Sequence, residues 1–244
     1  MQPLILLHGW GFNGSVWDSL LPELQNNFAV TVIDLPGYRS RPKVGGMTLG
    51  EMAEDVAEQV PESAVWLGWS LGGQVALQAA LNWPDKVSKL ILVGSTPRFV
   101  QGGGWREAIK QKVLDDFGKA LIRSRETTIG RFLTLQMLGA KMSGESRELI
   151  KKLKLSLSEP PLNGTLEAGL QVLNETDLRP YLGSIKQPAH WIMGERDQLV
   201  PYSAGEIAAG QMESGTFTVI EGAAHAPFLS HREQFMEEVI RFGR

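Results

Sequence analysis

Cysteine is absent from the sequence, and so are long hydrophobic runs. The lack of cysteine excludes disulfides, thiolate zinc sites and a cysteine nucleophile. No apolar stretch reaches the roughly 18 residues that a membrane-spanning helix requires. The first residues also lack the basic segment and the small-residue cleavage site of a signal peptide. We therefore expect a cytoplasmic protein that does not bind membranes.

Net charge is low as well, because the 244 residues carry a formal charge of only −3. That value gives no reason to expect binding to nucleic acid. The charge is uneven, however: residues 105–154 hold 12 basic and 6 acidic side chains, so this segment carries +6 and the remainder −9. Zinc-binding histidine spacings are missing, and Gly102-Gly103-Gly104 lacks the strand, lysine and helix of a phosphate loop. We expect no metal and no nucleotide cofactor.

Short apolar runs alternate with helical patterns in the first hundred residues and again near the end of the chain. This rhythm is typical of parallel strands joined by crossover helices. The segment 97–182 shows helical patterns without clear strands and is too long for a simple loop. We predict an α/β sheet core formed by residues 1–96 and 183–244, with residues 97–182 inserted as a helical cap. The expected strands are Leu4–Leu7, Ala29–Ile33, Val65–Leu67, Leu90–Val93, His190–Met193 and Thr216–Ile220.

Two segments carry the pattern of a capping box, in which a serine or threonine is followed three residues later by glutamate. Thr48 with Glu51 precedes an amphipathic run of apolar residues, so a helix is expected to begin there. Ser230 with Glu233 predicts the start of the last helix.

The run Gly68-Trp69-Ser70-Leu71-Gly72 follows an expected strand and precedes a helical run of small residues. A Gly-x-Ser-x-Gly sequence in this context is typical of the nucleophile turn of α/β hydrolases, where the serine hydroxyl points away from the sheet. A chance match is the alternative, since the pattern is common in glycine-rich proteins. The strand-turn-helix context favours the catalytic interpretation. We therefore predict the α/β-hydrolase fold, a mostly parallel sheet flanked by helices, with Ser70 as nucleophile.

A serine nucleophile needs a base, and the chain offers four histidines. His190 lies within an expected strand and is interpreted as a packed core residue. His231 is placed in the first turn of the last helix as a solvated side chain, and His8 borders the first strand. His225 alone falls in a loop after a strand, among small neighbours, and we predict that it is the general base.

The acid that orients the histidine follows the preceding strand in this fold, in the chain order Ser, acid, His. Asp197 occupies that place. Glu195 is a rival, but it is close to the strand end and is expected to face solvent or to pair with Arg196. Asp177 is a third and more distant candidate.

Two backbone N–H groups are expected to stabilise the oxyanion that forms when the serine attacks a carbonyl. One belongs to Leu71, directly after the nucleophile. The other is assigned to Trp10, in the glycine-bounded turn that follows the first strand. The Trp10 side chain either lines an acyl pocket or is a packed core aromatic, and the residues leave both possibilities open.

Several stretches resemble the esterases that cleave the methyl ester of pimeloyl-acyl carrier protein in biotin synthesis, and the resemblance covers nearly the whole chain. Some belong to hydrolases generally, whereas the Trp-Leu-Gly-Trp-Ser run and the Arg-Phe-Leu-x-Leu-Gln run are narrower. The matching stretches are Leu6-Leu7-His8-Gly9-Trp10-Gly11, Asp34-Leu35-Pro36-Gly37, Trp66-Leu67-Gly68-Trp69-Ser70-Leu71-Gly72-Gly73, Arg131-Phe132-Leu133-Thr134-Leu135-Gln136 and Ala223-Ala224-His225-Ala226-Pro227-Phe228.

The resemblance implies a monomeric serine carboxylesterase that releases methanol by a Ser70–His225–Asp197 triad, through an acyl-enzyme. It also implies that an acidic carrier protein docks on the basic cap, although these cations can equally be solvated helix faces that pair with Glu145 and Glu148. The residues expected to contact the acyl chain are Trp10, Ser70, Leu71, Phe132, Leu133, Thr134, Leu135, Gln136 and His225. The candidate docking residues are Arg131, Arg147, Lys151 and Lys152.

Two features depart from the family pattern. The chain starts almost at the strand before His8, so the resemblance predicts a smaller sheet with one edge differently covered. Arg39 follows Tyr38 directly, where relatives often place a second glycine. The alternatives are therefore a broader short-chain carboxylesterase, a carbon–carbon bond hydrolase with the same triad, and a hydrolase fold that only binds ligands.

Overall fold

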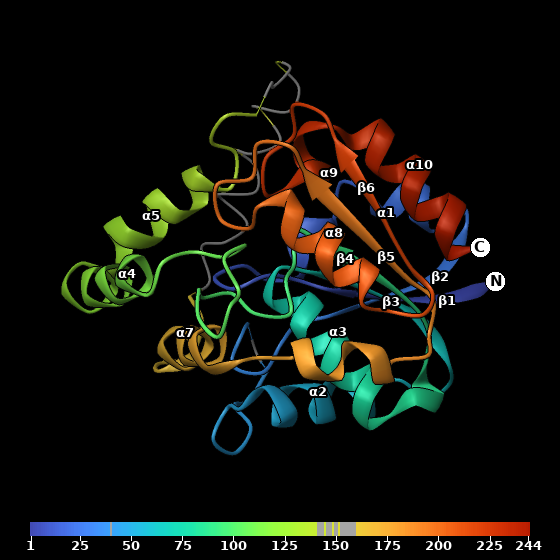
Figure 1. Cartoon of the computed structure of the whole chain (residues 1–244), viewed down its shortest axis with the longest axis horizontal. Coiled ribbons are helices and arrows are strands. Elements are labelled where there is room, and N and C mark those ends of the chain that lie inside the picture. Colours follow the sequence, from blue (N-terminus) through green and yellow to red (C-terminus); the bar gives the residue numbers. More distant parts are fainter. Residues whose placement is uncertain (40, 141–143, 145–147, 149–150, 152–159) are drawn as a thin grey trace.

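The computed structural model describes the chain except for residues 40, 141–143, 145–147, 149–150 and 152–159. Its centre is a six-stranded sheet with the order β2-β1-β3-β4-β5-β6, in which every pair of neighbours is parallel (Figure 1). The sheet confirms the predicted α/β fold. Its strands are β1 (Gln2–Leu7), β2 (Phe28–Ile33), β3 (Ala64–Trp69), β4 (Val87–Val93), β5 (Ala189–Gly194) and β6 (Gly215–Ile220).

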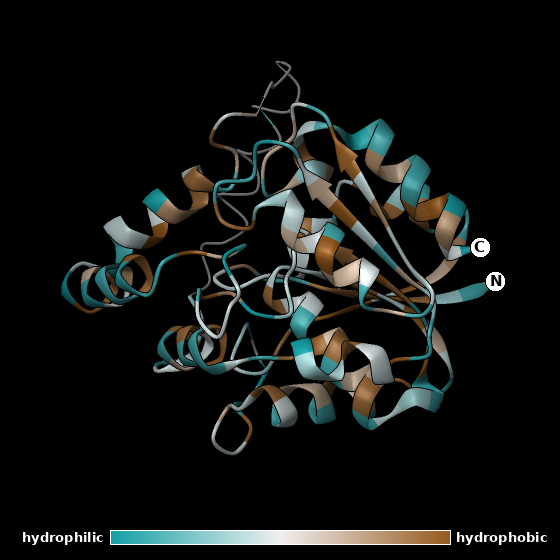
Figure 2. Cartoon of the chain, in the orientation of Figure 1, coloured by the Kyte–Doolittle hydropathy of each residue, from teal (hydrophilic) through white to brown (hydrophobic). Residues whose placement is uncertain are grey.

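Helices cover both faces of the sheet. Successive strand residues point to opposite sides, and because apolar side chains lie on both sides, each face has to be covered. In β1, Ile5 and Leu7 join the apolar cluster on one face of the sheet, under α2 (Leu49–Glu58), α3 (Leu71–Asn82) and α8 (Tyr202–Gly210). Leu4 and Leu6 join the cluster on the other face, under α1 (Leu21–Leu24), α9 (Pro227–Ser230) and α10 (Arg232–Gly243). In Figure 2 the helices carry hydrophilic and hydrophobic residues side by side, as expected for helices that pack on one face. The helices are α1 (Leu21–Leu24), α2 (Leu49–Glu58), α3 (Leu71–Asn82), α4 (Gln111–Arg123), α5 (Arg125–Leu135), α7 (Thr165–Glu175), α8 (Tyr202–Gly210), α9 (Pro227–Ser230) and α10 (Arg232–Gly243).

The register of the strands brings several loops to one edge of the sheet. Leu7 of β1 pairs with Gly68 of β3, and Trp69 of β3 pairs with Val93 of β4, so these three strands end almost level. In open parallel sheets, ligands bind outside the carboxyl ends of the strands. The loops after β1, β3, β4, β5 and β6 therefore surround the region where a site is expected.

One of the two expected capping boxes is present. The Thr48 hydroxyl accepts the Glu51 N–H, and the Glu51 carboxylate accepts the Thr48 N–H, which confirms the predicted start of α2. The prediction for Ser230 is wrong, because α10 begins at Arg232 without a side-chain cap. Ser230 instead ends the short helix α9, which Pro227 starts at the position where proline is best tolerated.

Between β4 and β5 the described residues form helices, with two isolated backbone bridges and no strand of the sheet. No described helix is long and apolar enough to cross a membrane. Helices α4, α5 and α7 lie to the left of the sheet in Figure 1.

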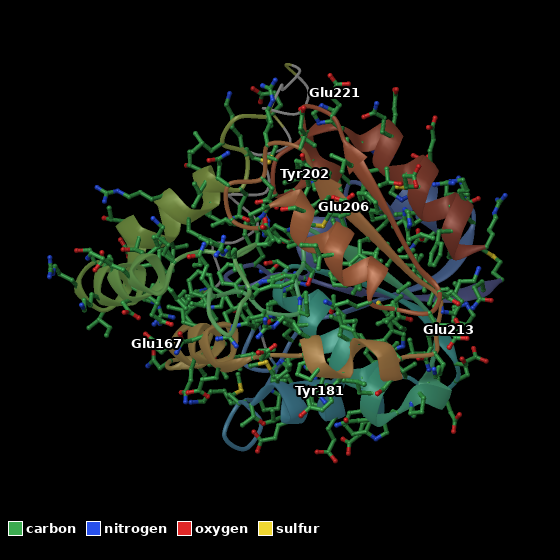
Figure 3. All side chains as sticks on the ribbon, viewed as in Figure 1. Glu167, Tyr181, Tyr202, Glu206, Glu213 and Glu221 are labelled. Carbon is green, nitrogen blue, oxygen red and sulfur yellow. The ribbon has the colours of Figure 1, made fainter. Side chains whose placement is uncertain are left out.

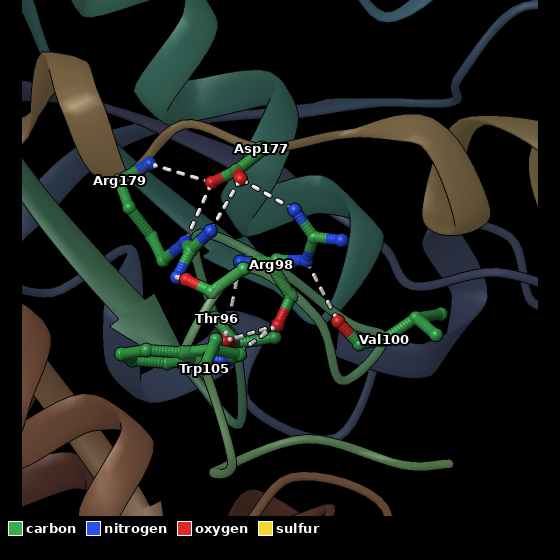
Figure 4. Close-up of polar contacts among 7 residues, drawn as sticks. Thr96, Arg98, Val100, Trp105, Asp177 and Arg179 are labelled. Atoms are coloured by element: carbon green, nitrogen blue, oxygen red, sulfur yellow. Dashed lines mark hydrogen bonds and ion pairs between the residues drawn. The ribbon is translucent and has the colours of Figure 1, made fainter. Parts of the chain in front are cut away.

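An ion cluster joins the two ends of the segment between β4 and β5 (Figure 4). Asp177 accepts hydrogen bonds from Arg179 at 2.6 and 2.7 Å and from Arg98 at 2.5 Å. Arg98 also donates to the Val100 carbonyl, and Arg179 donates to the Gly103 carbonyl. The Arg179 hydrogen bonds, followed by those of Arg98, lower the pKa of Asp177 to about 2. One carboxylate therefore links the chain at Arg98, which follows β4, to the chain at Arg179, which precedes β5.

The structure accounts for the departure at residue 39. Arg39 has a φ of +50°, the left-handed conformation that glycine adopts most easily. Its guanidinium lies 3.5 Å from the Asp34 carboxylate. The chain thus keeps a glycine-like backbone turn without glycine, at a cost of about 1–2 kcal/mol.

Candidate active site

Ser70 stands alone between β3, which ends at Trp69, and α3, which begins at Leu71. Its φ of +54° and ψ of −116° are rare for a residue with a side chain and store strain of the order of 1–3 kcal/mol. Hydrogen bonds hold this conformation, because the Ser70 N–H donates to Val93 and the Ser70 carbonyl accepts from Gly73 and Ser95. The Ser70 hydroxyl does not cap α3, so it is free for other contacts.

Two glycines allow the sharp turn around Ser70. A Cβ at Gly68 would lie 2.3 Å from the Gly72 carbonyl oxygen, and a Cβ at Gly72 would lie 2.6 Å from the Leu7 carbonyl oxygen. Both distances are far below van der Waals contact. The Gly-x-Ser-x-Gly pattern therefore lets the start of α3 pack directly against the ends of β3 and β1.

His225 and Asp197 form a buried ion pair at this edge of the sheet. His225 Nδ1 lies 2.7 Å from Asp197 Oδ2, and the two side chains are 1% and 0% exposed. The other carboxylate oxygen of Asp197 accepts the backbone N–H groups of Leu199 and Val200, at 2.8 and 2.9 Å. A buried charge with three hydrogen bonds is well compensated, and its position is fixed.

The remaining nitrogen of His225 is unused. A carboxylate only accepts hydrogen bonds, so Nδ1 carries the proton and Nε2 of the neutral ring is an acceptor. His225 Nε2 is buried and has no hydrogen-bond partner among the described residues. The ring lies beside the Ser70 turn, because the Trp69 indole donates to the His225 carbonyl and the two rings are 5.6 Å apart. The geometry thus places a histidine with an unused ring nitrogen beside the turn that carries Ser70.

The other candidate acids are bound elsewhere. Glu195 accepts the Gly222 N–H at 2.9 Å and lies 3.7 Å from Arg196, which agrees with the predicted pairing. Asp177 belongs to the arginine cluster of Figure 4. Among the acids weighed from the sequence, the structure brings Asp197 to His225.

The other histidines also have clear environments. His190 is buried in β5 between the Thr216 hydroxyl and the Glu238 carboxylate, at 2.8 and 2.9 Å, in agreement with a packed residue. His231 is half-buried and precedes α10, with its ring against the Ser230 hydroxyl, so its prediction as a solvated side chain in the first turn is wrong. His8 is fully buried beside the loop that carries Trp10.

The loop after β1 touches the nucleophile turn. A Cβ at Gly9 would lie 3.2 Å from Ser70 Cβ and 3.0 Å from the Trp69 ring, so this backbone passes directly over the serine. Neither the Leu71 N–H nor the Trp10 N–H donates to another described residue. The two expected oxyanion donors are therefore free, on the two segments that border Ser70.

The Trp10 side chain packs beneath the inserted helices. Its indole N–H donates to the Leu166 carbonyl of α7 at 2.8 Å, and its ring meets Phe117 and Phe132 edge to face at 5.4 and 4.9 Å. Trp10 is only 2% exposed. Trp10 is therefore a packed core aromatic, one of the two possibilities that the sequence left open, and the packing also places Phe132 next to the loop that carries Trp10.

The segment 132–136 is divided between exposed and buried positions. Phe132 contacts Trp10, and a Cβ at Gly11 would lie 3.7 Å from its ring. Thr134 is exposed, with its hydroxyl on the Gly130 carbonyl. Gln136 is buried and donates to the Phe132 carbonyl. Leu133 and Leu135 are partly buried against the two apolar clusters.

The candidate docking residues are only partly described. Arg131 is exposed on α5. Lys151 pairs with Glu148 at 2.6 Å, and both side chains are exposed. Arg147 and Lys152 lie outside the described residues.

Two cavities lined by described residues lie elsewhere, with volumes of about 280 and 630 Å³. The first lies between the start of α2 and α7, and the second beside Trp105 and Arg179. Ser70, Asp197 and His225 line neither cavity. In the described part of the chain, no group of three histidine or acidic side chains could hold a metal ion.

The sequence reasoning missed Tyr38. Its hydroxyl accepts the Gly11 N–H at 3.0 Å, and its ring packs on His8. The partners are 27 residues apart and follow different strands. No local sequence pattern predicts such a contact. The one available signal is that Tyr38 directly follows Asp34-Leu35-Pro36-Gly37, a stretch that resembles the family.

A serine on a strained strand-helix turn and a buried histidine–aspartate pair next to that turn are the arrangement found in α/β hydrolases. A family model described as "Alpha/beta hydrolase family" matches residues 4–238, and the chain belongs to that family.

Within it, the chain belongs with the pimeloyl-acyl-carrier-protein methyl ester esterases. It is 43% identical over 241 residues to the protein of that name from Pectobacterium carotovorum subsp. carotovorum (strain PC1), covering 99% of this chain and 94% of the relative. It is 40% identical over 239 residues to that from Aliivibrio salmonicida (strain LFI1238), covering 98% and 91%. A solved esterase from Exiguobacterium antarcticum matches with a TM-score of 0.89 at 25% identity, covering 99% of this chain and 91% of that one. The resemblance predicted from the motifs is confirmed.

Proposed function

We propose that this protein is a serine carboxylesterase that hydrolyses the methyl ester of pimeloyl-acyl carrier protein. Ser70 is the nucleophile, His225 the general base and Asp197 the acid that orients it. One observation carries the proposal: a buried His225–Asp197 pair at 2.7 Å leaves a free ring nitrogen, and His225 packs on Trp69, the neighbour of a serine held at φ +54°. This combination serves nucleophilic catalysis, and a purely structural turn has no need of it.

In the proposed reaction, His225 Nε2 takes the proton of the Ser70 hydroxyl while the serine oxygen attacks the ester carbonyl carbon. The carbonyl electron pair moves to oxygen, and the N–H groups of Leu71 and Trp10 bind the resulting oxyanion. Collapse of this intermediate breaks the bond to the methoxy oxygen, which leaves as methanol with the proton from His225. Water then attacks the acyl-enzyme by the same route and releases the acid and free Ser70.

The substrate assignment rests on the relatives and on the inserted segment. The relatives with 40–43% identity bear the name of this esterase. We propose that residues 97–182 act as a cap whose apolar side chains, Phe132 above all, hold the acyl chain over the oxyanion loop. The other acyl contacts predicted from the sequence, Leu133, Thr134, Leu135 and Gln136, belong to the same proposal.

The carrier protein is proposed to dock on the basic part of the cap. Residues 105–154 carry +6, and an acidic partner would be steered and oriented by this charge. Arg131 and Lys151 are the described docking candidates. The Lys151–Glu148 pair is exposed, so an acidic partner can displace Glu148 at little cost.

The test compares turnover of pimeloyl-acyl carrier protein methyl ester with turnover of a small p-nitrophenyl ester. We expect the carrier-bound ester to be strongly preferred, and Ser70→Ala to abolish both activities. Equal efficiency on both esters would favour a broader carboxylesterase. No labelling of Ser70 by a fluorophosphonate, together with no hydrolysis of either ester, would favour a protein that only binds ligands. Growth rescue of a strain that lacks the biotin-pathway esterase tests the assignment in the cell.

Charge reversal tests the docking site. The double variant Arg131→Glu with Lys151→Glu should weaken turnover of the carrier-bound ester, most at low salt, and spare the small ester. Lys186→Glu is the matched control, because Lys186 also pairs with an exposed glutamate, at 2.9 Å, but lies outside the basic segment. Equal losses on both esters in the double variant would indicate a misfolded cap.

A further inference from the structure

A tyrosine hydroxyl lies behind the loop that carries the proposed oxyanion donor Trp10. The Gly11 N–H donates to the Tyr38 hydroxyl at 3.0 Å, and Tyr38 is only 3% exposed. Burial raises the pKa of Tyr38, so the phenol stays neutral. The proposed chemistry makes no use of Tyr38, yet its polar atom is directed at the neighbour of Trp10.

His8 holds the other side of the same loop. Its Nε2 lies 2.9 Å from the Leu35 N–H, which can only donate, so the proton of the neutral ring sits on Nδ1. Nδ1 in turn donates to the Gly9 carbonyl at 2.9 Å. Burial lowers the pKa of His8 to about 4, which keeps the ring neutral at pH 7. The rings of His8 and Tyr38 meet edge to face at 4.7 Å, so the two supports pack as one unit.

These two hydrogen bonds, together with the one that the Phe12 N–H donates to the Gly9 carbonyl at 3.3 Å, fix the direction of the Trp10 N–H. The Gly9 carbonyl and the Trp10 N–H belong to one planar trans peptide and point in opposite directions. Because the carbonyl is held by His8, the N–H points away from His8. The Gly11 N–H belongs to the next peptide, which Tyr38 holds. Both peptide planes that flank the Trp10 α-carbon are therefore fixed.

We propose that Tyr38 is a positioning residue for the oxyanion hole, acting through the Gly11 peptide to hold the Trp10 N–H in place. This inference rests on the proposed function, in which that N–H binds the oxyanion. The loop lies over the nucleophile, since a Cβ at Gly9 would be 3.2 Å from Ser70 Cβ. Without the hydroxyl, the Gly11 N–H loses its acceptor, and the Trp10–Gly11 peptide can rotate toward another one.

The test is Tyr38→Phe, which removes one oxygen atom and keeps the ring. Its matched control is Tyr181→Phe, because Tyr181, labelled in Figure 3, is 54% exposed and lies on the 3-10 helix η3 (Arg179–Ser184). Each enzyme is assayed on p-nitrophenyl butyrate and on the matching thiono ester, whose sulfur is a poor hydrogen-bond acceptor. Rates are divided by the number of active sites that a fluorophosphonate titrates.

For Tyr38→Phe we expect kcat on the oxygen ester to fall by about 10- to 100-fold, with KM changed less than about twofold. The thiono ester gains little from the oxyanion donors, so its kcat should fall only a few fold, and the ratio of oxygen-ester to thiono-ester rates should drop. Tyr181→Phe should leave the ratio unchanged.

An unchanged ratio in Tyr38→Phe, whether both rates fall together or neither falls, would overturn the positioning role. Partial misfolding lowers the number of titrated sites without changing the ratio. If the wild-type protein is not labelled at Ser70 and hydrolyses neither ester, the proposed nucleophile is wrong and the positioning role is refuted with it.

Discussion

Replacement of Asp197 by asparagine should disable the proposed base, because it moves the ring proton of His225 from Nδ1 to Nε2. In the wild type, one carboxylate oxygen accepts the N–H groups of Leu199 and Val200, and the other accepts from His225. An asparagine must turn its carbonyl toward the two backbone donors. Its NH₂ group then faces His225 Nδ1, which has to become an acceptor, so the ring proton moves to Nε2.

The structure sets the size of this effect. The opposite orientation of the amide would leave two buried N–H groups without an acceptor, at about 1–3 kcal/mol each. The inactive tautomer is therefore favoured by about 2–6 kcal/mol, and at about 1.36 kcal/mol per tenfold change kcat should fall by about 30-fold to about 3 × 10⁴-fold.

The assay is hydrolysis of a p-nitrophenyl ester together with the rate of fluorophosphonate labelling, and both should fall by the same factor. Thermal unfolding checks that the variant is folded. Glu195→Gln is the matched control, because a glutamine oxygen can still accept the Gly222 N–H, and its activity should stay within about threefold of the wild type. The reasoning is refuted if folded Asp197→Asn keeps more than a tenth of the wild-type kcat, or if Glu195→Gln loses as much.

Three further predictions concern stability. Gly169→Ala places a Cβ 2.6 Å from Trp10 Cδ1 and should destabilise by about 1–3 kcal/mol in thermal or urea unfolding, whereas Gly118→Ala, with open space around it, should be neutral or stabilising. The pKa of Asp177 is lowered from 3.8 to about 2, so its contribution is present above pH 4 and lost as pH falls toward 2. The loss of stability in Asp177→Asn should therefore shrink over that range. The pKa of His8 is lowered from 6.5 to about 4, so as the pH falls His8 is protonated in the unfolded chain before it is protonated in the folded protein. The free energy of unfolding should therefore fall by about 3 kcal/mol between pH 6.5 and 4. The variant His8→Asn should lack this fall.

The predictable parts of the molecule are those that depend on local sequence. Buried strands and the turn around Ser70 follow from short apolar runs and from glycine spacing, and all six expected strands are present. The Asp197–His225 pairing could be anticipated because chain order in a parallel sheet fixes which loops meet. The start of the last helix was predicted incorrectly because Pro227 starts a separate short helix that uses Ser230 as its last residue.

Contacts that combine distant loops could not be predicted. The Tyr38 hydroxyl reaches Gly11 because β2 lies next to β1, so the loops after both strands meet at one edge. Spacing alone does not say which atom of a tyrosine will face a backbone N–H 27 residues away. The same holds for the Trp10 indole and the Leu166 carbonyl, which are 156 residues apart.

Trp10 connects the inserted helices with the proposed chemistry. Its ring packs on Phe117 of α4 and Phe132 of α5, and its indole N–H is bound to α7. His225 and Asp197 are instead hydrogen-bonded to each other, to Trp69 and to the loop after β5. A change in the proposed cap that shifts Trp10 should therefore disturb the proposed oxyanion donor while leaving the proposed acid–base pair intact. Such variants should lose kcat on oxygen esters but keep the pH dependence that the histidine imposes, and a shifted pH profile would contradict this separation.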